Sequence, residues 1–175
     1  GVRSLEKEYK KQNCGVLDER VIFKSWYSFL LSEFIKPYQC SLRLNNKIYK
    51  KEAPITIPEN FISSIAFYIT GSIPAWYKQT HLQYFLNSHG DIYPDRVSHL
   101  AYLCNEHSNE KPIARMEQIY SHIFIDELQD YAGWDLEIIQ LLFNSQISLS
   151  SVSDYKQATY RTNNSPKNRQ YRDEN

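Results

Sequence analysis

The 175-residue sequence is poor in cysteine, methionine and glycine, and it has no excess of either charge. Its three cysteines, Cys14, Cys40 and Cys104, show no CxxC or Cys/His ligand spacing. This pattern argues against a disulfide framework or a zinc site and predicts reduced thiols in the cytoplasm. Twenty basic and twenty acidic residues cancel. No global positive field therefore points to nucleic acid, and any such contact must be local.

Long apolar runs and a hydrophobic leader are also missing. No run approaches the ~20 residues that cross a membrane, so no membrane partner is expected. The charged start GVRSLEKEYKKQN is unlike a signal peptide. The only methionine is Met116, from which we expect the chain to begin inside a longer protein. Hydrophobic residues make up 42% of the chain, which predicts a packed core.

Apolar periodicity predicts an alternation of strands and helices from residue 21 onward. A charged helix over 2–13 precedes this alternation. Buried strands are expected at 21–23, 122–125 and 147–152. Helices are expected at 26–36, 95–104, 113–120 and 136–143. This order indicates an α/β fold with a parallel sheet flanked by helices.

An irregular stretch interrupts that alternation. Residues 37–92 contain prolines and many tyrosines without clear periodicity, and we expect a mostly helical insertion subdomain there. Residues 1–36 and 93–163 would then form the main domain. Residues 164–175 are polar and predict a flexible tail.

The clearest candidate for chemistry is a pair of carboxylates, Asp126 and Glu127, directly after the apolar run Ile123–Ile125. Open α/β sheets bind ligands at the carboxyl ends of their strands. Nucleoside triphosphate hydrolysis needs one carboxylate for Mg²⁺ and a second for the attacking water. The alternative is that both acids only charge the start of the next helix.

A second polar segment follows the next apolar strand. It runs SDYKQATY from Ser153, and 23 residues separate Asp130 from Asp154. DELQD at 126–130 followed by this segment resembles motifs II and III of the UvrD/Rep-type superfamily 1 DNA helicases. KSWYSF at 24–29 more faintly resembles their motif Ib.

The resemblance implies a partial P-loop NTPase (RecA-like) fold, ATP and Mg²⁺ as cofactors, and single-stranded DNA as partner. It assigns Mg²⁺ to Asp126 and the catalytic base to Glu127. Gln129 and Asp154 would contribute to the nucleotide site, where the catalytic Gln157 would sense the γ-phosphate.

The same resemblance assigns DNA contacts. Tyr160 would stack on a DNA base, a contact of ~1–3 kcal/mol. Ser25, Trp26 and Ser28 would line the DNA track, although core packing is an alternative role for Trp26.

The sequence departs from the family pattern in several places. Ser153 replaces the glycine that opens motif III, and Thr162 replaces a tryptophan that often follows it. No GxxxxGK[ST] loop occurs, so the phosphates would lack their backbone cradle and lysine. Motifs IV to VI, with the arginine finger, are absent as well.

Three hypotheses remain open. The chain is part of an ATP-dependent DNA helicase or translocase, inactive alone and completed by an upstream P-loop and a second motor domain. Alternatively it is a degenerate, non-hydrolysing module that binds DNA or a protein, which Ser153 and the serine-rich strand favour. The third is a nuclease built on Asp126 and Glu127, for which no third ligand is evident.

Overall fold

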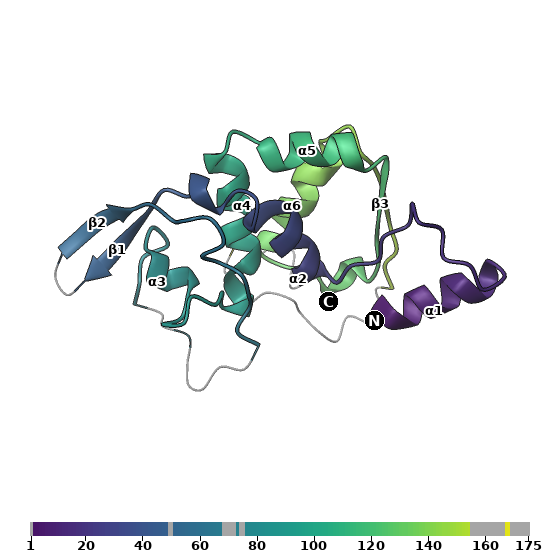
Figure 1. Ribbon diagram of the computed structural model, residues 1–175, viewed down its shortest axis with the longest axis horizontal. Helices are drawn as coiled ribbons and strands as arrows, with labels where there is room; N and C mark the ends of the chain where they lie inside the picture. The colour runs from purple at the N-terminus through teal and green to yellow at the C-terminus, as the bar shows by residue number, and fades with distance from the viewer. Residues whose placement is uncertain (1, 49–50, 68–72, 74–75, 155–166, 169–175) are drawn as a thin grey trace.

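The computed structural model describes residues 2–48, 51–67, 73, 76–154 and 167–168. Two small sheets and several helices alternate along the chain (Figure 1). The fold is therefore of mixed helix and strand content. One hydrophobic cluster contains buried side chains from Leu30 to Ile147, so segments far apart in the sequence share a core.

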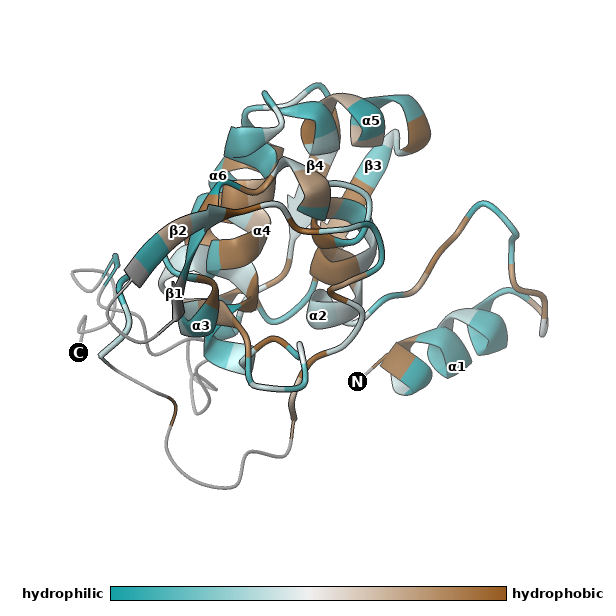
Figure 2. Ribbon diagram, turned by 60° about the vertical axis from the view of Figure 1, so that its left-hand side comes forward, coloured by the Kyte–Doolittle hydropathy of each residue, from teal (hydrophilic) through white to brown (hydrophobic). Residues whose placement is uncertain are grey.

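The first helix, α1 (Val2–Gln12), lies apart from the main body (Figure 1). None of its residues is buried, and its surface is mostly hydrophilic (Figure 2). Glu6 and Lys10 form an i,i+4 ion pair of 2.8 Å, a spacing that supports an exposed helix. The predicted solvated helix at 2–13 is confirmed.

The predicted strand at 21–23 is wrong. The chain is irregular from Val21 to Ser25, and Ile22 is 58% exposed. A strand needs a neighbour for its backbone hydrogen bonds, and no described segment pairs with this one. The predicted helix after it is present as α2 (Trp26–Phe29), which continues into the π-helix η1 (Leu30–Ile35).

The segment 37–92 is not mostly helical where it is described. It holds the 3₁₀ turn η2 (Gln39–Ser41), the antiparallel strands β1 (Leu44–Ile48) and β2 (Lys51–Ile55), and the short helix α3 (Leu82–Phe85). The two strands satisfy backbone groups of each other in an antiparallel ladder, with Leu44 opposite Ile55. This pairing replaces the helices that were expected in the segment.

The helical half of the core confirms the predicted periodicity. After the 3₁₀ turn η3 (Pro94–Arg96), α4 (Val97–His107) buries Val97, Leu100, Ala101 and Cys104. Helix α5 (Lys111–Ile119) follows, and α6 (Trp134–Phe143) packs on α4. All three helices contribute buried side chains to one hydrophobic cluster, among them Leu100 of α4, Met116 of α5 and Ile138 of α6.

Strands β3 (His122–Ile125) and β4 (Ser148–Ser151) pair in parallel, with Ile123 opposite Leu149. Helix α6 lies between them in the sequence, so they form a β–α–β unit. The expectation that β3 is buried is wrong for one face of the strand, because Phe124 is 78% exposed. A two-stranded sheet packed on helices by one face leaves the other open. A larger RecA-like sheet is not seen among the described residues.

Candidate functional site

The candidate site lies where β3 and β4 end. Asp126 and Glu127 leave β3, and Ser153 and Asp154 leave β4. Because the two strands are parallel, their carboxyl ends meet at the same edge. The side chains of Asp126 and Glu127 are exposed there. The carboxylates are thus presented to solvent and not packed into the core. We call this end of the sheet, with Asp126 and Glu127, the acidic edge.

Backbone hydrogen bonds hold the two chain segments together beyond the strands. The Val152 amide donates to the Ile125 carbonyl at 2.9 Å, and the Leu128 amide donates to the Val152 carbonyl at 3.0 Å. The chain then turns through the 3₁₀ helix η4 (Leu128–Asp130). These bonds fix the position of the acidic segment relative to the segment after β4.

Glu127 adopts a left-handed backbone conformation, with φ 54° and ψ 45°. Such a conformation costs a non-glycine residue roughly 1 kcal/mol or more. Its amide donates to Oδ1 of Asp126 at 3.1 Å.

Gln129 connects the two predicted motifs directly. Its Nε2 donates to Oε2 of Glu127, while its Oε1 accepts a 3.0 Å hydrogen bond from the Asp154 amide. One amide side chain therefore bridges the acidic turn and the segment after β4. Four of the predicted site residues, Asp126, Glu127, Gln129 and Asp154, are brought together at this edge. Gln157 and Tyr160 lie outside the described residues.

Ser25 is the N-cap of α2, and Ser28 lies inside that helix. The Ser28 amide donates to Oγ of Ser25 at 3.2 Å, and Ser25 Oγ donates to Ser28 Oγ at 2.8 Å. An N-cap serine satisfies an amide that lacks a partner within the helix. These hydroxyls have a structural role in the described chain, and their part in DNA contact stays a prediction.

Trp26 is half-buried and packs against the acidic segment. Its Nε1 donates to Oδ1 of Asp135 at 2.6 Å, and its ring meets the Tyr131 ring edge-on at 4.7 Å. Asp135 is buried and also accepts from Oγ of Ser98. The geometry agrees with the packing role weighed for Trp26 and ties α2 to the start of α6.

Sequence reasoning missed Asp135 and Tyr131 as neighbours of the site. Burial first, and then the carboxylates of Asp135, Asp126 and Asp130, raise the pKa of Tyr131 to about 12. Tyr131 is therefore neutral at physiological pH beside an acidic edge. The sequence signal was present in the tyrosine directly after DELQD and the aspartate in the first turn of the next helix.

The acidic edge offers a magnesium ion few protein ligands. No group of three or more His, Cys, Asp or Glu side chains is placed to hold a metal within the described ranges. Mg²⁺ usually keeps several waters and takes one or two carboxylates plus substrate phosphates. Asp126 and Glu127 fit that mode, whereas a closed all-protein metal cage does not occur among these residues.

The architecture defines an α/β domain whose β–α–β unit carries exposed carboxylates at its carboxyl edge. Comparison with known families names it more closely: the family model of the UvrD/REP helicase N-terminal domain matches residues 3–168. The chain belongs to this family of DNA helicases. No curated protein and no solved structure matches it. No helix in the described part is long and apolar enough to cross a membrane.

Proposed function

We propose that this chain supplies the metal and water side of the ATP site in an ATP-dependent DNA helicase or translocase. The observation that carries the proposal is the Gln129 bridge from Glu127 to the Asp154 amide. The bridge links Glu127, which we expect to act on ATP, to the segment after β4, which we expect to sense the γ-phosphate. The family match over residues 3–168 supports the same assignment.

In this proposal Asp126 holds Mg²⁺ and Glu127 takes a proton from the attacking water. A carboxylate that already accepts a hydrogen bond from Gln129 keeps further lone pairs for that water. Bound Mg²⁺ would offset the charge of the phosphate oxygens. Both side chains are exposed, so a bound nucleotide could reach them from solvent.

Coupling would run through Gln129 into the segment after β4. A change in the contacts of Glu127 would alter its hydrogen bond with Gln129. Because Gln129 also accepts from the Asp154 amide, the position of Asp154 would change as well. Gln157 would sense the γ-phosphate, and Tyr160 would stack on single-stranded DNA. The phosphate loop and the second motor domain would come from parts of the protein outside these 175 residues.

The isolated chain provides a first test. It should not hydrolyse ATP above background with Mg²⁺ and single-stranded DNA, because it has no phosphate cradle. Turnover at rates of about 1–100 s⁻¹, typical of enzymes, would overturn the proposed division of the site.

A second candidate is a degenerate module that binds DNA or a protein without hydrolysing ATP. The exposed serines Ser148 and Ser150 in β4 favour it, because a central strand of a parallel sheet is usually apolar. Single-stranded DNA binding by the chain, measured by fluorescence anisotropy, separates the two. The degenerate module predicts binding that ATP and Mg²⁺ leave unchanged even in the full-length protein.

A further inference from the structure

A pocket of about 440 Å³ lies at the C-terminal end of α4, away from the acidic edge. It opens between the α4–α5 connection and α6. Its lining residues are Tyr102, Asn105, Glu106, Asn109, Glu110 and Leu141. The volume is in the range of pockets that hold small ligands, ~300–1,000 Å³. Neither Asp126 nor Glu127 contributes to it, so it is a separate site.

The charge of the pocket is negative. Glu106 and Glu110 are exposed, and neither forms an ion pair with a cation in the described part of the chain. The pocket also lies at the C-terminal end of the 11-residue helix α4, where the helix dipole favours positive charge. Both effects attract a cationic ligand.

Asn105 provides an independent sign of a missing ligand. Its side chain is only 3% exposed, and its Oδ1 has no hydrogen-bond partner among the residues that the structure describes. An unsatisfied buried acceptor destabilises the folded state unless a donor is supplied to it. Asn105 is one of the residues that line the pocket, and its unpaired oxygen would accept a hydrogen bond from a donor bound there.

Tyr102 and Leu141 give the pocket an apolar wall. Such a wall suits the carbon chain of an organic cation, and a tyrosine ring attracts a cation over its face. Hydrated metal ions gain little from such a surface. The combination of two carboxylates, a free amide acceptor and a partly apolar wall points to a cation that carries several N–H donors.

We propose that this pocket binds an organic cation through an alkylammonium or guanidinium group. The cationic head donates hydrogen bonds to Glu106, Glu110 and the Asn105 amide, and its carbon chain lies along Tyr102 and Leu141. The site would recognise this group on a free polyamine or on a basic side chain of another protein. It does not depend on the helicase proposal, because it shares no residue with the acidic edge.

Isothermal titration calorimetry of the 175-residue chain with agmatine, and separately with spermidine, tests the proposal. We expect saturable binding at one site. The double variant Glu106→Gln/Glu110→Gln should weaken it at least about tenfold, because two charge-assisted hydrogen bonds are lost. The control Glu19→Gln/Glu59→Gln removes the same charge from exposed positions elsewhere and should change the affinity less than about twofold.

A third variant separates recognition from structure. Asn105→Leu removes the amide acceptor and should weaken cation binding roughly fivefold, whereas a purely structural Asn105 would lower the free energy of unfolding and leave the affinity of the folded protein unchanged. Saturation by an arginine-containing peptide but not by agmatine or spermidine, with the same dependence on Glu106 and Glu110, would assign the site to a protein partner. The proposal is overturned if no ligand saturates by about 10 mM. Equal affinity of the double variant and the wild type would overturn it as well.

Discussion

At the scale of single residues, Asp135 joins α2, which lies in the segment that resembles motif Ib, to the first turn of α6. Its carboxylate is 1% exposed and accepts from Trp26 Nε1 and Ser98 Oγ. A buried charge is stable only where hydrogen bonds replace the lost water. Trp26 therefore holds α2 against α6 through a polar contact as well as through its ring.

Replacing Trp26 with phenylalanine tests this contact. Trp26→Phe keeps most of the aromatic packing but removes the Nε1–H donor to a buried carboxylate. We expect a loss of about 1.5–3 kcal/mol in the free energy of unfolding, the range for a hydrogen bond to a charged group. Urea denaturation measures it. Trp76→Phe, at a site that is 73% exposed, is the matched control and should change stability by less than about 0.5 kcal/mol.

The Gln129 bridge makes a second prediction at this scale. Gln129→Leu removes the acceptor for the Asp154 amide, whose hydrogen exchange should accelerate by roughly fivefold or more for a bond worth about 1 kcal/mol. Amide exchange followed by NMR measures this directly. Gln140→Leu removes an exposed side chain of α6 whose Nε2 donates to Oδ1 of Asn144, so it should leave the Asp154 amide unchanged. An unchanged rate in Gln129→Leu would contradict the bridge.

The sequence predicted the residues at the acidic edge better than their partners. Asp126 and Glu127 follow an apolar strand directly, a local pattern that places them at its carboxyl end. The contact between Gln129 and Asp154 spans 25 positions, and the contact between Trp26 and Asp135 spans 109. Local pattern carries no information on such distant pairings, which depend on how α6 packs.

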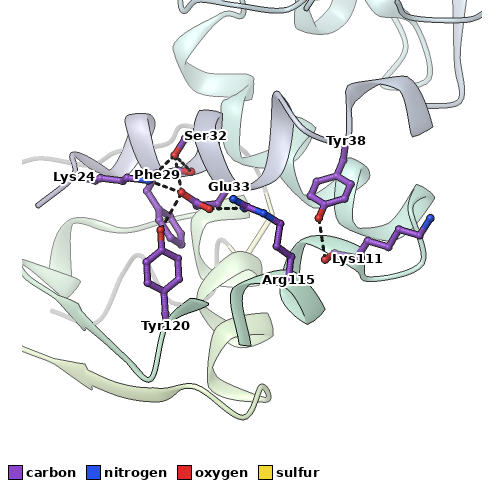
Figure 3. A network of polar contacts seen from close by, with 8 residues as sticks. All are labelled: Lys24, Phe29, Ser32, Glu33, Tyr38, Lys111, Arg115 and Tyr120. Carbon is purple, nitrogen blue, oxygen red and sulfur yellow. Dashed lines mark hydrogen bonds and ion pairs between the residues drawn. The ribbon is translucent and has the colours of Figure 1, made fainter. Parts of the chain in front are cut away.

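At the scale of elements, a buried carboxylate connects three segments of the chain. Glu33 of η1 accepts from Lys24 before α2, from Arg115 of α5 at 2.7 Å, and from the Tyr120 hydroxyl at 3.1 Å (Figure 3). Tyr120 lies two residues before β3. This network fixes the start of β3, the strand that precedes Asp126, relative to α2, the helix that contains Trp26.

The network predicts how stability depends on pH. Burial alone would raise the pKa of Glu33, but hydrogen bonds from Lys24, Arg115 and Ser32 outweigh it and lower the pKa from 4.5 to about 2. A lowered carboxyl pKa stabilises the fold above the unfolded value, and the contribution is lost as pH falls from about 4.5 toward 2. The contribution is at most about 3 kcal/mol.

Comparing wild type with Glu33→Gln by urea denaturation at several pH values measures this contribution. The difference in unfolding free energy should be largest above about pH 5 and should shrink as the pH falls from about 4.5 toward 2. Below pH 4.5 the unfolded chain takes up a proton at Glu33, while the folded protein, whose Glu33 pKa is about 2, still keeps the carboxylate charged. Glu59→Gln, an exposed acid, should show little difference at either pH. A Glu33→Gln difference that is constant with pH would contradict the assigned charge state.

Helices were easier to predict than strands for a physical reason. Helix α4 satisfies its backbone internally, so the spacing of Val97, Leu100, Ala101 and Cys104 was enough to locate it. Strands need partners, and the apolar run at 21–23 has none among the described residues. The hairpin of β1 and β2 is polar along most of its length, and its pattern could not be separated from an irregular loop.

At the scale of the whole molecule, the β3–β4 sheet has one covered and one open face. His122 and Phe124 stack on the open face at 4.2 Å, and Phe124 is largely exposed. Under the proposed function, further structure near the carboxyl ends of β3 and β4 would bring a phosphate loop to Asp126 and Glu127. The proposal therefore places the complete activity in the full-length protein and the acid chemistry in this chain.

The most direct test measures ATP hydrolysis by the full-length natural protein with single-stranded DNA. Glu127→Gln should lower kcat by about 10²–10⁴-fold, the usual contribution of a general base, while ATP binding and the folded structure persist. Glu59→Gln, with the same charge change at an exposed site, should hydrolyse ATP at the wild-type rate. Hydrolysis by Glu127→Gln at the wild-type rate would contradict the assignment of this edge as the catalytic side of the ATP site.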